Sequence, residues 1–496
     1  MGLIVNTIRL SDVFVGLADR WGDSTAVGSP QLTLSYSELI IRAARSAREL
    51  RSGGIGPGAR VGIAIRDGAE TVVLMIALWM LGATVVPIDF RTNSGERARL
   101  ANEFDLLAVL EDREIRGVSY ASMIIDPSWT DLIARHDSSP LFQSGEESGA
   151  AFISLTSGTT SRPIGFILDH ERALLRFLTA PSQHGAALLN PLSLSFSGSR
   201  THTFSALFHG AAVRFHPVLF SPEQLAEAIL AWNVTSVCVV PTIIRSLLEL
   251  GRGRSSPMFY ELDAFYSIGA PILAAEKLQS KTILCTNFIE DYGSTVSGPI
   301  SSLYGSDVEA RPESLGRVRP HTVLQIVDEN DRILPFGETG VIRVRCPGMA
   351  RSTYGSGEQR SSGDMLKAGW AYPGDIGTID EKHFLRLVGR SSDVIIRGGA
   401  NVHPAEVEAA IGEHEGVQDV AVVGFTKFPE GQEIAAFVVG SNNVTEAALV
   451  AHCRARLSSD KRPRKFLFVK ELPRNANGKI SRAELRKQLE GPVSAD

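Results

Sequence analysis

Ile153-Ser-Leu-Thr-Ser-Gly-Thr-Thr-Ser-Arg-Pro-Ile-Gly165 is the stretch of this chain that most narrows its fold and chemistry. The apolar segment 151–155 predicts a strand that leads into the loop, and the Arg-, Ala- and Leu-rich segment after His170 predicts a helix that leaves it. Gly158 and Gly165 let the backbone turn its N–H groups inward. Hydroxyl donors for anionic oxygens come from Thr156, Ser157, Thr159, Thr160 and Ser161. The loop predicts a phosphate cradle, although its spacing is not that of a Walker A loop and a Ser/Thr-rich surface loop explains it equally well.

The composition is that of a globular chain with several domains. With 496 residues, 44% hydrophobic and 21% charged, two or three domains are expected. A net charge of -5 gives no sign of a nucleic-acid surface. Cys238, Cys285, Cys346 and Cys453 lie far apart, which argues against a disulfide framework and against a zinc site. We expect a cytoplasmic protein, because the N-terminal residues also lack an export signal.

The segment from Thr71 to Phe90 is almost wholly apolar and resembles a membrane span in composition. Gly82 interrupts it, and the residues after Gly82 have the β-branched content of a buried strand. A helix, a turn and a strand explain the segment better, so no membrane span is predicted.

Helical and strand-like segments alternate along most of the chain, which predicts an α/β fold with mainly parallel sheets covered by helices on both faces. We expect a large N-terminal domain of doubly wound sheets over residues 1–390. It includes a small β subdomain at about 315–390, where short strands are separated by turns. A small, mobile α+β domain follows at 391–496, after a boundary near 390–393.

Four further stretches carry residue types suited to a nucleotide, although a simple turn explains each one when taken alone. Asp291-Tyr-Gly-Ser-Thr295 offers a ring for a base and a hydroxyl for a phosphate, and Tyr372-Pro-Gly-Asp375 offers a carboxylate for ribose hydroxyls. The segment from Gly389 to Glu408 contains Arg390 and the pair Gly398-Gly399. Leu472-Pro-Arg-Asn-Ala-Asn-Gly-Lys-Ile480 places Lys479 after a tight turn.

The order and separation of these five stretches resemble the adenylate-forming superfamily of acyl-CoA synthetases, peptide-synthetase adenylation domains and luciferases. The resemblance covers essentially the whole chain and is strongest to an acyl- or aryl-CoA synthetase. It implies an AMP-forming acid–thiol ligase that uses ATP, Mg²⁺ and CoA. Such an enzyme activates a carboxylic acid to an acyl adenylate and then passes the acyl group to a thiol.

The resemblance also implies roles for individual residues. Lys479 would bridge the substrate carboxylate and the α-phosphate as a catalytic residue. Thr295, the second catalytic candidate, would hold the phosphates together with the loop 156–161. Asp375 would hold the ribose, Arg390 the ribose or phosphate edge, and Ser392 would mark the hinge. The nucleotide site would consist of Thr156, Ser157, Gly158, Thr159, Thr160, Gly269, Ala270, Pro271, Asp291, Tyr292, Gly293, Asp375 and Arg390. Gly398 and Gly399 would line the path of the CoA thiol.

Two positions depart from the pattern of the family. Ile164 stands where relatives commonly carry a lysine, and Val296 stands where a glutamate usually helps to hold magnesium. The metal ligands are therefore unknown from the sequence, with Arg162 as a substitute cation and Glu290 or Asp291 as substitute ligands through water. Loss of two charge-assisted contacts is expected to slow adenylation unless other groups replace them.

The identity of the acid is left open. The expected acyl pocket draws on Pro191 to Phe204, Pro241 to Arg245 and Ser297 to Pro299, with Phe196, Arg200, His202, Ser297 and Gly298 as candidate contacts. No carrier domain follows Lys479 in the sequence, so the thiol acceptor is expected to be CoA or a separate carrier protein. A stand-alone amino-acid adenylating enzyme and a degenerate nucleotide- or acyl-binding member are the alternatives.

Overall fold

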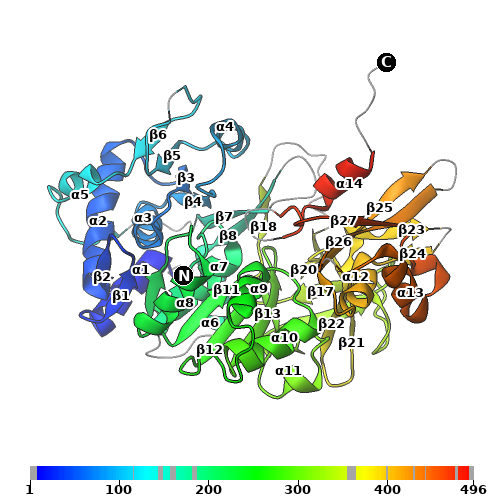
Figure 1. Ribbon diagram of the computed structural model, residues 1–496. Coiled ribbons are helices and arrows are strands. Elements are labelled where there is room, and N and C mark those ends of the chain that lie inside the picture. The colour runs from blue at the N-terminus through cyan, green and yellow to red at the C-terminus, as the bar shows by residue number, and fades with distance from the viewer. Residues whose placement is uncertain are drawn as a thin grey trace.

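The computed structural model describes residues 8–115, 117–142, 149–156, 163–180, 187–354, 365–397, 400–427, 431–441, 443–474 and 479–490. In Figure 1 the orange and red C-terminal elements form a group of their own beside the blue-to-green body of the chain. Three large sheets build that body, with nine, seven and six strands, and two small sheets belong to the C-terminal group.

The nine-stranded sheet is parallel through its centre and antiparallel at both edges. Its order is β15-β14-β13-β12-β11-β9-β10-β1-β2. The strands are β1 (Thr25–Gly28), β2 (Thr33–Ser35), β9 (Ala187–Asn190), β10 (Ala212–Phe215), β11 (Ser236–Val239), β12 (Ala264–Ile268), β13 (Phe288–Ser294), β14 (Gly298–Leu303) and β15 (Arg317–Val318). The central strands are buried along their length, as expected for a sheet that is covered on both faces.

The seven-stranded sheet has the order β18-β8-β7-β4-β3-β5-β6 and carries the strand that enters the Ser/Thr-rich loop. Its members are β3 (Arg60–Ala64), β4 (Thr84–Pro87), β5 (Ala108–Glu111), β6 (Ser122–Ile124), β7 (Ala150–Thr156), β8 (Ile164–Asp169) and β18 (Ser352–Tyr354). The antiparallel strand β8 leaves the loop directly and was not expected from the sequence. Together with β7 it forms a hairpin, and that loop connects the two strands.

Helices cover the two doubly wound sheets. The helices are α1 (Leu10–Trp21), α2 (Tyr36–Ser52), α3 (Gly68–Met80), α4 (Ser94–Glu103), α5 (Ser128–Ile133), α6 (His170–Thr179), α7 (Ser197–Phe208), α8 (Pro222–Ala231), α9 (Pro241–Leu250), α10 (Ala274–Gln279) and α11 (Asp307–Ala310). Five of these described helices, α2, α3, α4, α6 and α8, begin with a capping side chain. Ser35 and Ser221 form capping boxes that start α2 and α8. Helix α7 was not expected from the sequence.

The apolar segment after Asp67 is core. Helix α3 is buried along its length from Ala69, Gly82 turns the chain with φ +69°, and β4 returns it into the sheet. Across the described ranges, every helix is too short or too polar to cross a bilayer.

The six-stranded sheet forms the β subdomain. It contains β16 (Val323–Val327), β17 (Gly340–Arg345), β19 (Leu366–Lys367), β20 (Trp370–Ala371), β21 (Asp375–Ile379) and β22 (Leu385–Arg390). The strand β15, inside the expected range 315–390, belongs instead to the nine-stranded sheet because it pairs with β14.

The C-terminal group consists of two small sheets and three helices. It contains β23 (Ile395–Arg397), β24 (Ala400–Val402), α12 (Pro404–Gly412), β25 (Val417–Lys427), β26 (Gly431–Gly440), α13 (Glu446–Arg456), β27 (Lys465–Phe468) and α14 (Arg482–Glu490). Its buried core starts at Ile395, whereas the core of the large body ends at Leu385. The α/β fold class is confirmed, although β27 does not end the fold as expected, since α14 follows it.

Candidate functional site

Asp375, at the start of β21, is the centre of a group of residues that come from three distant parts of the chain. Its carboxylate is 4% exposed. The hydroxyl of Tyr292, on β13, donates to Asp375 Oδ2 at 2.5 Å. Arg390, at the end of β22, donates from Nε to Asp375 Oδ1 at 2.8 Å, and its Nη2 donates to the carbonyl of Pro373 at 3.2 Å. Three residues predicted for the nucleotide site are therefore in direct contact.

Lys479 joins this group from the far end of the chain. Burial, followed by repulsion from Arg390, lowers the pKa of the Lys479 ammonium, while Asp375 acts to raise it. These influences place Lys479 near both residues, although the residue keeps an exposed surface. For Arg390, burial acts to lower the pKa of the guanidinium but Asp375 outweighs it, so the net shift is upward. Burial and the Asp375 carboxylate raise the pKa of Tyr292, so its hydroxyl stays protonated as a donor.

The turn between β13 and β14 contains Thr295, and a side chain of helix α6 hydrogen-bonds to it. Arg176 on α6 donates to the carbonyls of Thr295 at 3.1 Å and Gly348 at 2.7 Å. The Ser294 and Ser297 hydroxyls lie 2.8 Å apart across the turn. Gly293 is needed in the hairpin, since a Cβ there would lie 2.5 Å from the carbonyl oxygen of Gly298.

The predicted wall Gly269-Ala-Pro271 follows β12 and meets the loop after β9. Gly269 has φ +90°, and a Cβ there would lie 2.7 Å from the ring of Phe196. A candidate wall residue for the nucleotide and a candidate contact for the acyl group are thus neighbours.

The remaining predicted residues divide into those described and those not described. Ser157, Gly158, Thr159, Thr160, Arg162, Gly398 and Gly399 lie outside the described residues. Thr156 is described as the last residue of β7, paired with Ile164. Ser392 is exposed in a short 3-10 helix, Ser391–Asp393, and the N–H of Ser391 donates to the carbonyl of Gly374.

Arg200 and His202 on α7 are buried, and their described partners are other protein groups. Arg200 donates to the carbonyls of Leu194 and Ser195 and to the hydroxyl of Ser154. His202 packs on the ring of Tyr266 with its Nε2 3.5 Å from Asp291 Oδ2. Burial lowers the pKa of His202, although Asp291 acts to raise it. The lowered pKa favours a neutral imidazole. The contact of either residue with an acyl group stays a prediction.

The residues suggested as magnesium ligands in place of Val296 contact other protein groups. Val296 is 1% exposed within the main hydrophobic core. The carboxylate of Glu290 is ion-paired with the buried Lys277, and Asp291 accepts from the hydroxyl of Ser302. Within the described ranges there is also no group of three or more His, Cys, Asp or Glu side chains that could hold a metal ion. The two suggested substitutes are engaged elsewhere.

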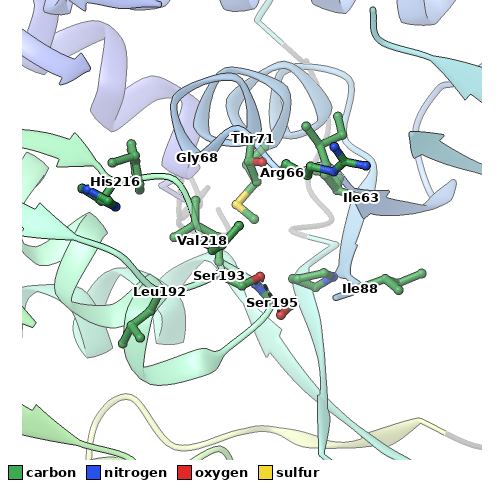
Figure 2. A pocket seen from close by; sticks show the side chains of 15 residues that line it. Ile63, Arg66, Gly68, Thr71, Ile88, Leu192, Ser193, Ser195, His216 and Val218 are labelled. Atoms are coloured by element: carbon green, nitrogen blue, oxygen red, sulfur yellow. Dashed lines mark hydrogen bonds between the residues drawn. The ribbon is translucent and has the colours of Figure 1, made fainter. Parts of the chain in front are cut away.

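A pocket lies where the carboxyl ends of strands from both doubly wound sheets meet (Figure 2). The pocket is small, with a cavity volume of about 20 Å³. Apolar side chains such as Ile63, Met75 and Phe215 line it together with the loop Leu192–Ser195. In Figure 2, Arg66 lies on the α3 side of the pocket. The hydroxyls of Ser193 and Ser195 form a hydrogen bond in its wall. The loop belongs to the predicted acyl region, whereas Ser297 and Pro299 line a second, smaller cavity.

Arg176 is the main residue of the site that the sequence interpretation missed. The signal in the sequence was weak, an arginine within the segment after His170 that was expected to be helical. Its hydrogen bonds to carbonyls of Thr295 and Gly348 depend on a fold that brings residues more than a hundred positions apart into contact.

Comparisons with known proteins agree with this geometry. The family model described as AMP-binding enzyme matches residues 16–354, and the model of the AMP-binding enzyme C-terminal domain matches residues 406–479. The chain is 27% identical over 479 residues to a 2-succinylbenzoate–CoA ligase of Bacillus anthracis (strain A0248), which covers 94% of this chain and 96% of the relative. It is 30% identical over 363 residues to a long-chain-fatty-acid–CoA ligase of Escherichia coli O6:H1, covering 69% and 62% of the two chains.

A solved structure of ATP-bound MatB from Rhodopseudomonas palustris has a similar fold, with a TM-score of 0.88 and 25% identity. The match covers 98% of this chain and 99% of that one. The o-succinylbenzoate CoA synthetase of Bacillus subtilis, solved with its acyl-adenylate intermediate, shares the fold at a TM-score of 0.84 and 23% identity, over 98% and 99% of the two chains. The predicted superfamily is confirmed: the chain belongs to the AMP-binding enzyme family.

Proposed function

We propose that this protein is an AMP-forming acid–thiol ligase that activates a carboxylic acid with ATP and transfers the acyl group to CoA. The observation that carries the proposal is the meeting of Tyr292, Asp375, Arg390 and Lys479 at one place in a chain of the AMP-binding enzyme family. The class of enzyme agrees with the curated relatives, which are CoA ligases matched over most of this chain.

The proposed first step joins two anions, so the protein must offset their repulsion. Lys479 is proposed to lie between the acid's carboxylate and the α-phosphate, where its ammonium can contact both. A carboxylate oxygen attacks the α-phosphorus, the bond to the bridging oxygen of pyrophosphate breaks, and pyrophosphate leaves. Asp375, oriented by Tyr292 and Arg390, is proposed to accept the ribose hydroxyls.

In the second step the CoA thiol loses its proton and attacks the carbonyl carbon of the acyl adenylate, and AMP leaves. Gly398 and Gly399 are proposed to line the thiol path, and residues from 391 onward to move as a unit about Ser392. Mg²⁺ is proposed to enter with ATP, since the described residues near Val296 do not offer it a set of ligands. No step is assigned to the metal.

For the acid, we propose the pocket of Figure 2 as the acyl site. Its apolar side chains favour an aryl or alkyl group, and polar groups such as Arg66 and Ser195 also line it. Because the cavity is small, its side chains would have to move apart to admit the acid. The curated relatives are named for 2-succinylbenzoate and for long-chain fatty acids.

The test is ATP-dependent CoA consumption across a panel of benzoic, succinylbenzoic, medium-chain, long-chain and amino acids. Consumption with an aryl or alkyl acid supports the proposal. Acid-dependent pyrophosphate exchange without CoA consumption would favour a carrier-protein acceptor. ATP binding without exchange would favour the degenerate member, which the residues Ile164 and Val296 suggest.

A further inference from the structure

Two arginines are buried side by side in the large body without a carboxylate to balance them. Arg176 is 2% exposed and Arg200 is 3% exposed. In the part of the chain that the structure describes, neither guanidinium lies within ion-pair distance of an aspartate or glutamate. Removing such a charge from water is costly, and most buried charges are paired.

Carbonyl and hydroxyl oxygens satisfy the hydrogen-bond donors but leave the positive charges uncompensated. Arg176 donates to the carbonyls of Gly348, Thr295 and Val296 at 2.7, 3.1 and 3.5 Å. Arg200 donates to the carbonyls of Leu194 and Ser195 and to the Ser154 hydroxyl, each at 2.7 Å, and lies over the ring of Phe152. Burial lowers the pKa of Arg176 to about 10, and burial followed by repulsion from Arg176 lowers that of Arg200 to about 9, so both remain charged at neutral pH.

One arginine contacts a residue proposed to bind phosphate, and the other contacts the strand that leads to such residues. Arg176 holds the backbone of Thr295, and Arg200 holds Ser154, two residues before the end of β7. The same region has Ile164 and Val296 where the chain could have carried a charged group and a metal ligand.

We propose that Arg176 and Arg200 are positioning residues that also supply a standing positive charge to the phosphates of ATP and to pyrophosphate. This inference rests on the proposed function and deepens it. Charges fixed in a dry interior need no reorganisation when the pyrophosphate charge develops, and low polarity around them lets their field reach farther than it would in water. The described hydrogen bonds of both guanidiniums go to protein groups, so we assign the two arginines a positioning role and not a catalytic one.

Ser154→Asp tests the charge of Arg200 without removing the guanidinium, because Ser154 Oγ already lies 2.7 Å from Arg200 Nη2. Ser154→Asn is the matched neutral control. Binding of ATP and of adenosine is measured by calorimetry without divalent cations, so that the protein provides the positive charge. We expect the Asp variant to bind ATP about tenfold more weakly than the Asn variant, as loss of one charge-assisted contribution implies, and to bind adenosine equally well.

Arg176→Lys and Arg176→Gln form a second pair of variants. This pair tests the effect of the buried charge on ATP binding if the Ser154→Asp variant does not fold. The Lys variant keeps the charge and the Gln variant keeps only hydrogen bonding. We expect the Gln variant to lose about tenfold more ATP affinity than the Lys variant, with equal adenosine binding.

Equal ATP affinity within each pair would overturn the inference, and so would parallel losses of ATP and adenosine affinity, which would mark a purely structural role. Failure of the wild type to bind ATP would instead overturn the proposed function, and this inference with it.

Discussion

At the scale of single residues, Lys479 has the most demanding proposed role, because its ammonium must contact both the carboxylate and the α-phosphate. We expect Lys479→Ala to lower acid-dependent pyrophosphate exchange by about 100- to 1,000-fold, the usual cost of removing a group that stabilises developing charge. Lys470→Ala, at an exposed lysine outside the site, is the control and should match the wild type. Full exchange activity in the Lys479 variant would rule out its proposed role.

The lowered pKa of Lys479 predicts the alkaline side of the pH profile. The proposed bridge needs the protonated ammonium, and burial together with Arg390 favours its neutral form. The exchange rate should therefore fall on raising the pH before the range where an ordinary lysine loses its proton, about pH 10.4. Lys479→Arg should move that fall to higher pH whatever its rate. An unchanged alkaline limb in this variant would assign the titration to another group.

At the scale of elements, the hairpin of β13 and β14 requires a glycine at position 293, because there is no room for a Cβ atom there. A Cβ there would lie 2.5 Å from a backbone oxygen of the facing strand, which cannot move aside as a flexible side chain can. We expect Gly293→Ala to lower the free energy of unfolding by about 1–3 kcal/mol and to reduce adenylation as Thr295 shifts. Gly56→Ala, where the added Cβ meets nothing within 4 Å, is the control. Urea denaturation with parallel exchange assays checks both effects.

The regular elements were largely predictable, because their signals are local. Alternation of apolar segments indicated the strands β3, β4, β11 and β12, and helix α3 followed from the same reasoning. Helix α7 was missed because hydroxyls and small residues obscure its periodicity. The strand β8 was missed because it is a short apolar segment whose state is decided by its pairing with β7 and with the distant β18. In the site, motifs indicated Asp375 and Arg390, whereas the bond from Tyr292 to Asp375 and the part played by Arg176 required the tertiary fold.

At the scale of the whole molecule, the C-terminal group brings Lys479 to the residues proposed for the nucleotide, as the proposed first half-reaction requires. Lys479 belongs to this group and lies near Asp375 and Arg390 of the large body. Leu273 also packs near Gly412 across the two parts, and His403 at the start of α12 lies beside Gly389. The two parts share few buried apolar residues, because their cores are separate clusters. A rotation between them therefore exposes little core, which is the physical condition for domain movement.

Ser392 provides the test of that movement. It lies exposed in the short 3-10 segment Ser391–Asp393, and the φ typical of a 3-10 segment is one that proline adopts. Asp393 beside it is held by Arg482 and Arg486. Ser392→Pro should fix the arrangement seen here, with Lys479 near the nucleotide residues. We expect pyrophosphate exchange to stay within about twofold of the wild type while transfer to CoA in a single turnover falls far more, since transfer needs the other arrangement. Ser392→Ala removes the same hydroxyl without restricting the backbone and should leave both half-reactions intact. Equal rates of transfer in the Pro and Ala variants would mean that residues 391 onward do not rotate about Ser392. The thiol would then have to reach the acyl adenylate while Lys479 stays near the nucleotide residues.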